Sequence, residues 1–181
     1  MTIALHWPEP PQILEYYRRS LEALAALKTT LTSSVRVQSR FFGMTAHEVE
    51  RALRELAQEL DHEVTLLLTA SFEATFQVDF RRRLARKKKD RLSKKLRKLW
   101  RKYKRAKWVV VEDILDVWQK ETGHVQAIGK LKQLIKFRHW LAHGRYWVQK
   151  SGLLNPDPFD AWMIGKAVFD VLPGFGRLAS V

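Results

Sequence analysis

The sequence predicts an all-α fold, a bundle of four to five helices with a strongly basic helical extension. Apolar residues recur at alternating spacings of three and four along most of the chain, which is the periodicity of helices with one buried face. The 8 glycines and 6 prolines lie mostly near the ends, so the middle is left for long helices. Val35, Val37 and Phe41 alternate like a strand, but one short strand has no partner, and we assign this segment to a helix end and a loop.

Two long helices are expected in the first half of the chain, over residues 12–30 and from residue 45 to about residue 80. The apolar side of the first is formed by Ile13, Tyr16 or Tyr17, Leu21, Leu24, Leu27 and Leu31. The second begins with Thr45 and Glu48, which have the spacing of a capping box. In that motif each side chain accepts a hydrogen bond from the backbone of the other residue, so the start of this helix is well defined.

Three more helices are expected in the second half. They cover residues 108–122, 124–143 and 157–172. Gly144 follows the second of them at a position typical of a helix C-terminus. Asp157 and Pro158 have the order of a cap and a first-turn proline, which indicates the start of the third. The chain has no internal repeat, and we expect one domain over residues 1–181.

The net charge of +14 comes from one segment. Residues 81–107 contain 17 Lys or Arg and one acidic residue, Asp90, whereas the rest of the chain has 16 basic and 18 acidic residues. A narrow apolar seam runs through the segment, formed by Leu92, Leu96, Leu99 and Tyr103. Asp90 is placed to cap a separate helix. We therefore expect residues 81–107 to form a basic amphipathic arm.

The arm indicates a polyanionic partner. Clustered cations repel one another and destabilise the segment unless a polyanion binds it. Nucleic acid is favoured, bound through its phosphates and sensitive to salt, because nothing in the chain resembles a base-reading module. An acidic membrane surface is the rival, since Trp100, Tyr103 and Trp108 suit a membrane interface. An arm that only docks by its seam is the third interpretation.

Composition excludes several classes of protein. The chain has no cysteine, which excludes disulfides and thiolate metal sites. No run of 18 apolar residues is present to span a membrane, and residues 1–8 lack the layout of a secretory signal. We therefore expect a soluble, cytoplasmic protein without a transmembrane segment.

The helix expected at residues 124–143 contains a cation in its apolar stripe. The stripe is formed by Ile128, Leu131, Ile135 and Ala142, and Arg138 takes its remaining place. Burying an unpaired guanidinium is very costly, because it keeps its proton at ordinary pH. Arg138 therefore needs a carboxylate or a ligand phosphate. Residues 64–78 contain a single charge, Glu73, which we expect to be the partner; a partly exposed glutamate at a helix edge is the alternative.

Arg138 and His143 form the pattern Arg-x4-His near the end of this helix. The pattern, in a small all-helical domain, resembles the HEPN superfamily (higher eukaryote and prokaryote nucleotide-binding), many of whose members are metal-independent RNases. The residue after the arginine is often Asn or Asp in that family and is His139 here. Where some toxin members have a modified tyrosine two residues after the histidine, this chain has Arg145.

The resemblance implies an activity and the residues that perform it. The activity is endoribonuclease cleavage without metal or cofactor, leaving a 2′,3′-cyclic phosphate. Arg138 would hold the scissile phosphate, His143 would transfer the proton, and Glu73 on an earlier helix would complete the site. The resemblance also implies a homodimer with a composite site, which the spacing of five residues permits. A toxin or anti-phage role, with a possible cognate antitoxin, is what the family suggests.

Further contacts to RNA are expected from cations and one histidine. These residues are His139, Arg145, Lys136, Arg81, Arg82, Arg83, Lys87, Lys88, Lys94, Lys95, Lys98 and Arg101. Trp140, Tyr146 and Trp147 are candidates to stack on bases, but aromatics at helical spacing are more often core or dimer contacts. His139 and His143 have the spacing of a zinc-binding pair, yet the glutamate that should follow the first histidine is Trp140, and we expect no metal.

Two other functions remain open. A non-catalytic HEPN-like module would bind nucleotide, nucleic acid or a partner protein. A structural helical protein would use the basic arm to bind DNA, RNA or membrane, with Arg138 in an ordinary internal ion pair.

Overall fold

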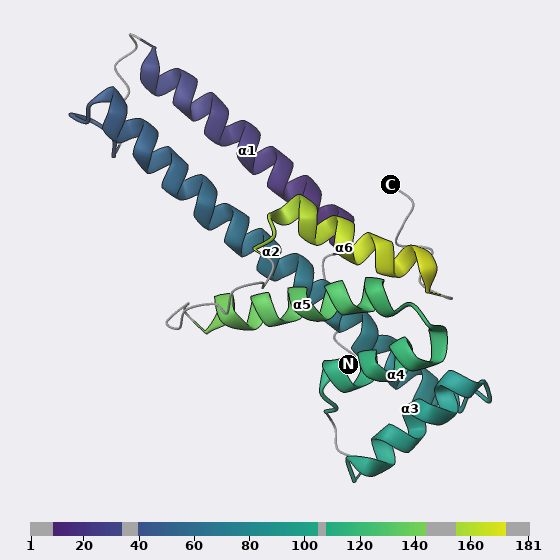
Figure 1. Ribbon diagram of the computed structural model, residues 1–181. Coiled ribbons are helices and arrows are strands. Elements are labelled where there is room, and N and C mark those ends of the chain that lie inside the picture. Colours follow the sequence, from purple (N-terminus) through teal and green to yellow (C-terminus); the bar gives the residue numbers. More distant parts are fainter. Residues whose placement is uncertain (1–8, 34–39, 105–107, 144–154, 173–181) are drawn as a thin grey trace, which may run out of the picture.

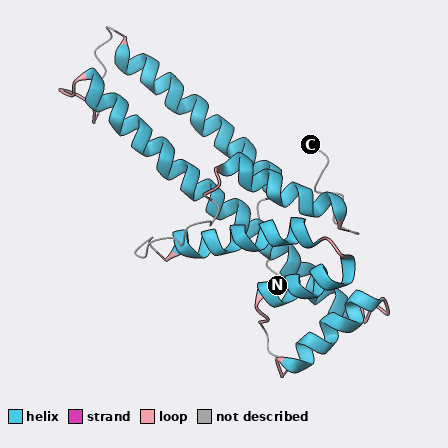
Figure 2. Cartoon of the chain, in the orientation of Figure 1, coloured by secondary structure: helices cyan, strands magenta, loops and turns pink. Residues whose placement is uncertain are grey.

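The computed structural model describes residues 9–33, 40–104, 108–143 and 155–172, and all regular structure in them is helical (Figures 1 and 2). The six helices are α1 (Pro10–Thr32), α2 (Ala46–Ala85), α3 (Arg91–Lys102), α4 (Val111–Thr122), α5 (Val125–Ala142) and α6 (Pro158–Val171). The predicted all-α class is confirmed. Five of the helices correspond to those expected along the chain, and the basic segment supplies α3 together with the last turn of α2.

Helix α2 is the axis of the molecule. It is 40 residues long, about 60 Å at 1.5 Å per residue, and it contacts each of the other five helices (Figure 1). Helix α1 lies beside its first half, whereas α4, α5 and α6 pack on its second half. The fully buried side chains of Val64, Leu68, Phe72 and Phe76 form one stripe of α2 at the centre of the main core. The helix continues five residues past the predicted end at Phe80, because Phe80 and Arg83 are also buried.

The predicted helix starts are confirmed where a side chain caps the helix. Oγ1 of Thr45 accepts a hydrogen bond from N of Glu48 at 3.3 Å, and N of Thr45 donates to the Glu48 carboxylate at 2.8 Å. Asp90 caps α3 by accepting from N of Ser93 at 2.9 Å. Asp157 caps α6 by accepting from N of Asp160 at 2.8 Å, with a proline in the first turn. Each cap satisfies a backbone N–H that the helix itself leaves without a partner.

Helix α5 buries a wider stripe than the sequence predicts. Its fully buried residues are Ile128, Leu131, Leu134, Ile135 and Phe137. The assignment of Ala142 to this stripe is wrong, since Ala142 is exposed at the last turn, where α5 extends past the helices it packs on (Figure 1). Helix α5 therefore crosses α2 through its middle turns and presents its C-terminal turn to solvent.

Helix α6 approaches α2 closely at Gly165. A Cβ atom built on Gly165 would lie 2.1 Å from Cζ of Phe72, so the ring of Phe72 takes the space of the missing side chain. Phe72 also packs edge-on against Phe169, with ring centroids 5.5 Å apart. The contact holds α6 against the part of α2 that leads to Glu73.

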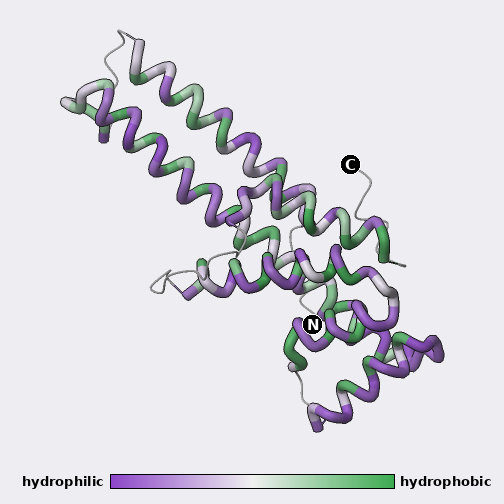
Figure 3. Tube along the Cα trace, in the orientation of Figure 1, coloured by the Kyte–Doolittle hydropathy of each residue, from purple (hydrophilic) through white to green (hydrophobic). Residues whose placement is uncertain are grey.

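Polar and apolar residues are distributed unevenly over the helices. Figure 3 shows hydrophilic residues along α3 and at the end of α2, and hydrophobic residues where the helices cross. In the described part of the chain, no helix combines the length and the apolarity needed to cross a membrane.

Candidate functional site

Arg138 and Glu73 form an ion pair between α5 and α2. Nη1 of Arg138 donates to both carboxylate oxygens of Glu73, at 3.2 and 3.3 Å. The side chains are 27% and 16% exposed, so the pair lies at the edge of the core with one side open to solvent. The prediction that Glu73 is the counter-charge of Arg138 is confirmed. A catalytic role for either residue stays a prediction.

A second acid–base pair lies beside the first. Oε1 of Glu112, on α4, is 3.8 Å from Nδ1 of His139, the residue after Arg138. The distance is longer than a hydrogen bond, so the interaction is electrostatic and depends on protonation of the imidazole. Glu112 is the residue that the sequence prediction missed. It lies in the first turn of α4. No local sequence motif indicates that it would contact a histidine on the next helix.

The pKa shifts show that these groups share one electrostatic environment. Burial raises the pKa of Glu73; the charge of Arg138 and its hydrogen bond oppose this, whereas Glu112 adds to it. Burial lowers the pKa of His139; Glu112 opposes this, whereas the positive charges of Arg138 and His143 add to it. Removing any one charge of the cluster therefore changes the protonation of its neighbours.

His143 occupies the C-cap of α5 and is exposed. Its backbone N–H donates to the carbonyl of His139 at 3.1 Å, which keeps the end of the helix ordered up to this residue. Arg138 faces α2, whereas His143 lies one and a half turns later, at the solvent end of the helix. In a single copy of the chain, His139 is thus the imidazole next to the Arg138–Glu73 pair, and His143 lies beyond it.

The donor groups of the cluster fit an anion better than a metal. Within the described ranges, no three His, Cys, Asp or Glu residues come close enough together to hold a metal ion. Nε of Arg138 is buried and has no hydrogen-bond acceptor among the residues that the structure describes. Because Nε is buried, a phosphate would meet the guanidinium on its exposed side, and a planar guanidinium is suited to that contact.

Most of the predicted nucleic-acid contacts are exposed on one end of the molecule. Eight of the predicted contacts on α2, α3 and the turn between them are exposed: Arg81, Arg82, Lys87, Lys88, Lys94, Lys95, Lys98 and Arg101. Lys136 is exposed on α5, beside the cluster in sequence. Gly144, Arg145, Tyr146 and Trp147 lie outside the described residues.

Arg83 is a correction to the sequence prediction. It is 8% exposed, and its guanidinium donates to Asp79 at 2.6 Å, to Asp90 at 3.3 Å and to Oγ of Ser93 at 3.2 Å. Its Cζ also lies 5.0 Å from the ring centroid of Trp118 on α4. Arg83 therefore joins α2, α3 and α4 from the inside and does not face a ligand.

Helix α3 is part of the bundle and not a detached arm. Leu96 is fully buried, and the rest of the apolar seam packs partly buried against the main core. Trp100 and Tyr103, predicted to suit a membrane interface, also pack there, and the Tyr103 hydroxyl donates to Asp113 of α4. The seam therefore faces inward, and only the cations of α3 face solvent.

The turn between α2 and α3 presents three lysines in a fixed backbone. Lys87 has a φ of 49°, in the left-handed region, and the carbonyl of Lys88 accepts from Nη1 of Arg97 at 2.6 Å. Asp90 closes the turn; burial of its carboxyl is outweighed by hydrogen bonds from Ser93 and by the charge of Arg83, which lower its pKa. The side chains of Lys87, Lys88 and Lys89 are exposed, so the turn concentrates positive charge at one point.

Trp140 packs on Phe137, with ring centroids 5.6 Å apart, and is partly buried. This contact favours the packing interpretation of Trp140 over base stacking.

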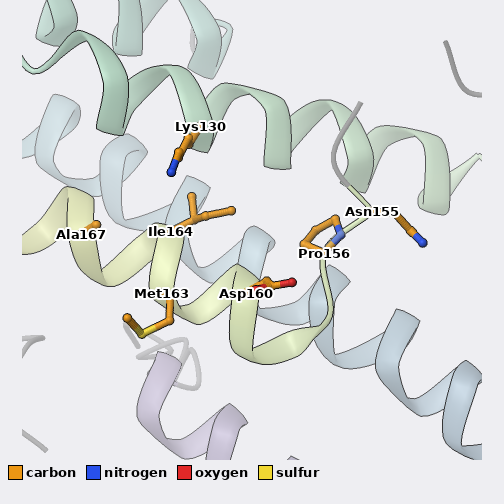
Figure 4. A pocket seen from close by; sticks show the side chains of 7 residues that line it. All are labelled: Lys130, Asn155, Pro156, Asp160, Met163, Ile164 and Ala167. Atoms are coloured by element: carbon orange, nitrogen blue, oxygen red, sulfur yellow. The ribbon is translucent and has the colours of Figure 1, made fainter. Parts of the chain in front are cut away.

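A groove between α5 and α6 lies apart from these residues (Figure 4). It has a volume of about 430 Å³ and is lined by Lys130, Asn155, Pro156, Asp160, Met163, Ile164 and Ala167. None of these is a residue of the Arg138 cluster or of the basic surface. Its lining is mostly apolar, with one cation and one carboxylate.

No protein-family model matches the chain, and neither the curated proteins nor the solved structures contain a match.

Proposed function

We propose that the protein is a metal-independent endoribonuclease of HEPN type, with Arg138, His143 and Glu73 as its site. The observation that carries the proposal is the contact between Arg138 and Glu73. The resemblance implies an arginine near the end of a bundle helix with an acidic residue on an earlier helix, and the two side chains meet in the fold. The exposed cations of α2 and α3 would hold the RNA.

Arg138 is suited to bind the scissile phosphate. Glu73 engages only its Nη1 atom, and the Arg138 side chain is 27% exposed, so the guanidinium keeps a side that a ligand can reach. Burial raises the pKa of Glu73, which makes its charged form less favourable than that of an exposed glutamate. An incoming phosphate therefore competes with a weakened carboxylate for the same cation. In the transition state Arg138 would stabilise the charge that grows on the phosphoryl oxygens.

His143 is suited to transfer the proton. A base takes the proton of the ribose 2′-OH, the 2′-oxygen attacks phosphorus, and the bond to the 5′-oxygen breaks. The 5′-oxygen takes a proton, and the products are a 2′,3′-cyclic phosphate and a 5′-hydroxyl end. His143 is exposed at the end of α5, where a strand of RNA can reach it. General acid–base catalysis of this kind contributes about 10²- to 10⁴-fold.

The biological setting is an extension of the same proposal. A homodimer that shares the site between two copies would bring His143 of one copy towards Arg138 of the other. A cytoplasmic toxin or anti-phage effector, with a cognate antitoxin, is the role that the resemblance suggests. Both rest on the resemblance alone.

Cleavage of bulk tRNA in the presence of EDTA tests the activity. The wild type is expected to cleave, with products that end in a 2′,3′-cyclic phosphate, while His143→Ala and Arg138→Gln lose at least about 100-fold in rate. His124→Ala is the matched control, because His124 lies at the other end of α5, as its N-cap, and makes no side-chain cap hydrogen bond. Circular dichroism confirms that each variant is folded.

Two outcomes contradict the proposal. Equal cleavage by the wild type and all three variants would place the activity in a contaminant or at another site. RNA binding without cleavage by any of them would assign the chain to the non-catalytic binding modules instead.

A further inference from the structure

Trp108 is a fixed, exposed indole on the basic end of the molecule. Its side chain is 63% exposed, the most of the five tryptophans in the described residues. The guanidinium of Arg81 packs on it, with Cζ 4.4 Å from the ring centroid. The next residue, Val109, is 2% exposed, and its carbonyl accepts from Nε2 of Gln77 at 2.7 Å. The backbone is thus anchored on α2, and the indole is held outside the core.

Trp108 stays 63% exposed although Arg81 packs on its ring, so much of the indole is available to a ligand. A guanidinium stacked on an aromatic ring is attracted by the negative charge of the ring face. The ring is therefore oriented by α2, through Gln77 and Arg81, which lie one turn apart on the same side of that helix. A planar partner that lands on the exposed part of the ring meets a surface that is already in place and loses little entropy in ordering it.

Further exposed cations lie on α2 beyond Arg81, in the turn that follows it and on α3. Arg81, Arg82 and Arg86 are exposed along the last turns of α2, and five residues of α-helix correspond to about 7.5 Å. The fixed turn with Lys87, Lys88 and Lys89 follows directly, and α3 returns from it with further exposed cations (Figure 1). Arg81 is the cation in contact with the indole, and Figure 1 shows the lysine turn at the end of α3 away from the start of α4, farther along the same end of the molecule.

We propose that Trp108, supported by Arg81, is a base-stacking platform for single-stranded RNA. A nucleobase stacks on the exposed indole, the cations of α2 contact the phosphates next to it, and the lysine turn contacts phosphates farther along the strand. Only an unpaired base offers its face in this way, because in a duplex both faces are covered by neighbouring base pairs. The inference rests on the proposed function, because it specifies that the RNA cleaved at the Arg138 site is single-stranded.

A membrane surface fits these observations less well. A basic amphipathic helix binds a membrane by burying its apolar face among the lipids. The apolar face of α3 is already used inside the protein, since Leu96 is fully buried and Leu92 and Leu99 pack against the core. Outside the core, the indole and two valines are exposed, Val78 at 51% and Val110 at 53%. The stacked cation of Arg81 and the planar ring face suit a base more than a lipid chain.

Binding of an RNA that cannot be cleaved tests the platform. The probe is a fluorescein-labelled, 2′-O-methyl, uridine-rich oligonucleotide, used single-stranded or as a duplex with its complement, and the readout is anisotropy with the full chain. Trp108→Ala is expected to weaken single-strand binding at least about tenfold and duplex binding by less than about twofold. The slope of affinity against salt should stay unchanged, because no phosphate contact is lost.

Three controls separate stacking from other causes. Trp108→Leu keeps an apolar side chain over Arg81 but has no aromatic face, and it is expected to behave as Trp108→Ala. Trp108→Phe keeps an aromatic face and is expected to recover most of the affinity. Phe42→Ala removes an aromatic side chain that is 79% exposed at the opposite end of α2, and it is expected to change nothing.

Several results would overturn the proposal. They are an unchanged single-strand affinity in Trp108→Ala, an equal loss for single strand and duplex, or Trp108-dependent binding to phosphatidylserine vesicles without binding to RNA. Its failure is distinguishable from that of the proposed function. Loss of binding in Trp108→Ala with no cleavage by the wild type refutes the nuclease only, whereas His143-dependent cleavage with no role of Trp108 refutes the platform only.

Discussion

Glu73 and Arg138 are 65 residues apart in the chain, yet Nη1 of Arg138 lies 3.2 and 3.3 Å from the two carboxylate oxygens of Glu73. The contact ties α5 to the middle of the longest helix. It also places His139 and Glu112 next to the pair, so two acids and two bases from three helices form one cluster. The stability of the fold and the chemistry of the proposed site are therefore linked through the same charges.

Removing one partner of this pair should destabilise the protein. Glu73→Ala leaves a partly buried guanidinium without its carboxylate, and we expect a loss of about 2 kcal/mol in the free energy of unfolding, less than the 3–5 kcal/mol of a fully buried pair. Urea unfolding of Glu73→Ala, Arg138→Met and the double variant measures the coupling. The exposed pair Glu15–Arg19 is the control, with an expected coupling below about 0.5 kcal/mol. Strict additivity at Glu73 and Arg138 would mean that the contact contributes nothing.

The cluster should make stability depend on pH through His139. Its pKa in the folded protein is lowered by burial, so the stability that it contributes is present above the unfolded value of 6.5 and is lost as the pH falls below that value. We expect the wild type to lose stability as the pH falls below about 6.5, and His139→Asn to lose less. Urea unfolding at several pH values measures the difference. The raised pKa of Glu73 has the opposite sign: its contribution to stability is present below the ordinary value of 4.5 and is lost as the pH rises above it.

The control for this effect is an exposed histidine on α2. His47→Asn is expected to keep the pH dependence of the wild type. If His139→Asn also keeps it, the imidazole of His139 does not lose its proton on folding, and the cluster is looser than the contacts indicate.

Two glycines in helices should respond to alanine with opposite signs. At Gly165 the new methyl group meets the ring of Phe72 at 2.1 to 2.5 Å, and we expect a loss of about 2 kcal/mol in unfolding free energy. At Gly129 on α5 a Cβ has nothing within 4 Å, and alanine should stabilise the helix by about 0.5–1 kcal/mol. Thermal and urea unfolding of the two variants measure this. A neutral Gly165→Ala would show that Phe72 can move away without cost.

Replacing the buried Arg83 should destabilise the protein, whereas replacing its exposed neighbour Arg82 should not. The single ammonium group of a lysine cannot replace the planar guanidinium of Arg83, which donates to Asp79, Asp90 and Ser93 together. We therefore expect Arg83→Lys to lose about 2 kcal/mol in the free energy of unfolding. Arg82→Lys changes an exposed side chain and should stay within about 0.5 kcal/mol. Trypsin should cut the α2–α3 turn faster in Arg83→Lys than in Arg82→Lys. Equal rates would show that the turn is held by other contacts.

The lysine turn should contribute to RNA binding through charge alone. Replacing Lys87, Lys88 and Lys89 by Gln is expected to reduce the slope of log affinity against log salt for a single-stranded RNA by about 2, which is 0.7 for each phosphate contact. The double variant Arg18→Gln and Arg19→Gln, on the exposed side of α1, should leave the slope unchanged. An unchanged slope in the triple variant would remove the turn from the RNA-binding surface.

The sequence determined the features whose causes lie within a few residues. The caps at Thr45, Asp90 and Asp157 were predictable, because the hydrogen bonds that define them span three residues. The helices followed from the spacing of apolar side chains. Even the Arg138–Glu73 contact was predictable, since a cation in an apolar stripe needs a counter-charge and one long apolar run offered a single carboxylate.

Only the tertiary structure decided which of several similar residues are buried, which are exposed and which partners they contact. Of the 15 cations in residues 81–104, only Arg83 is buried, because three helices meet there and bring two carboxylates and a hydroxyl to it. Glu112 reaches His139 only through the packing of α4 on α5, and Trp108 is exposed only because Val109 beside it is anchored on α2. A sequence pattern reports the helix that a residue belongs to, whereas its burial and partners depend on surfaces that are distant in the chain.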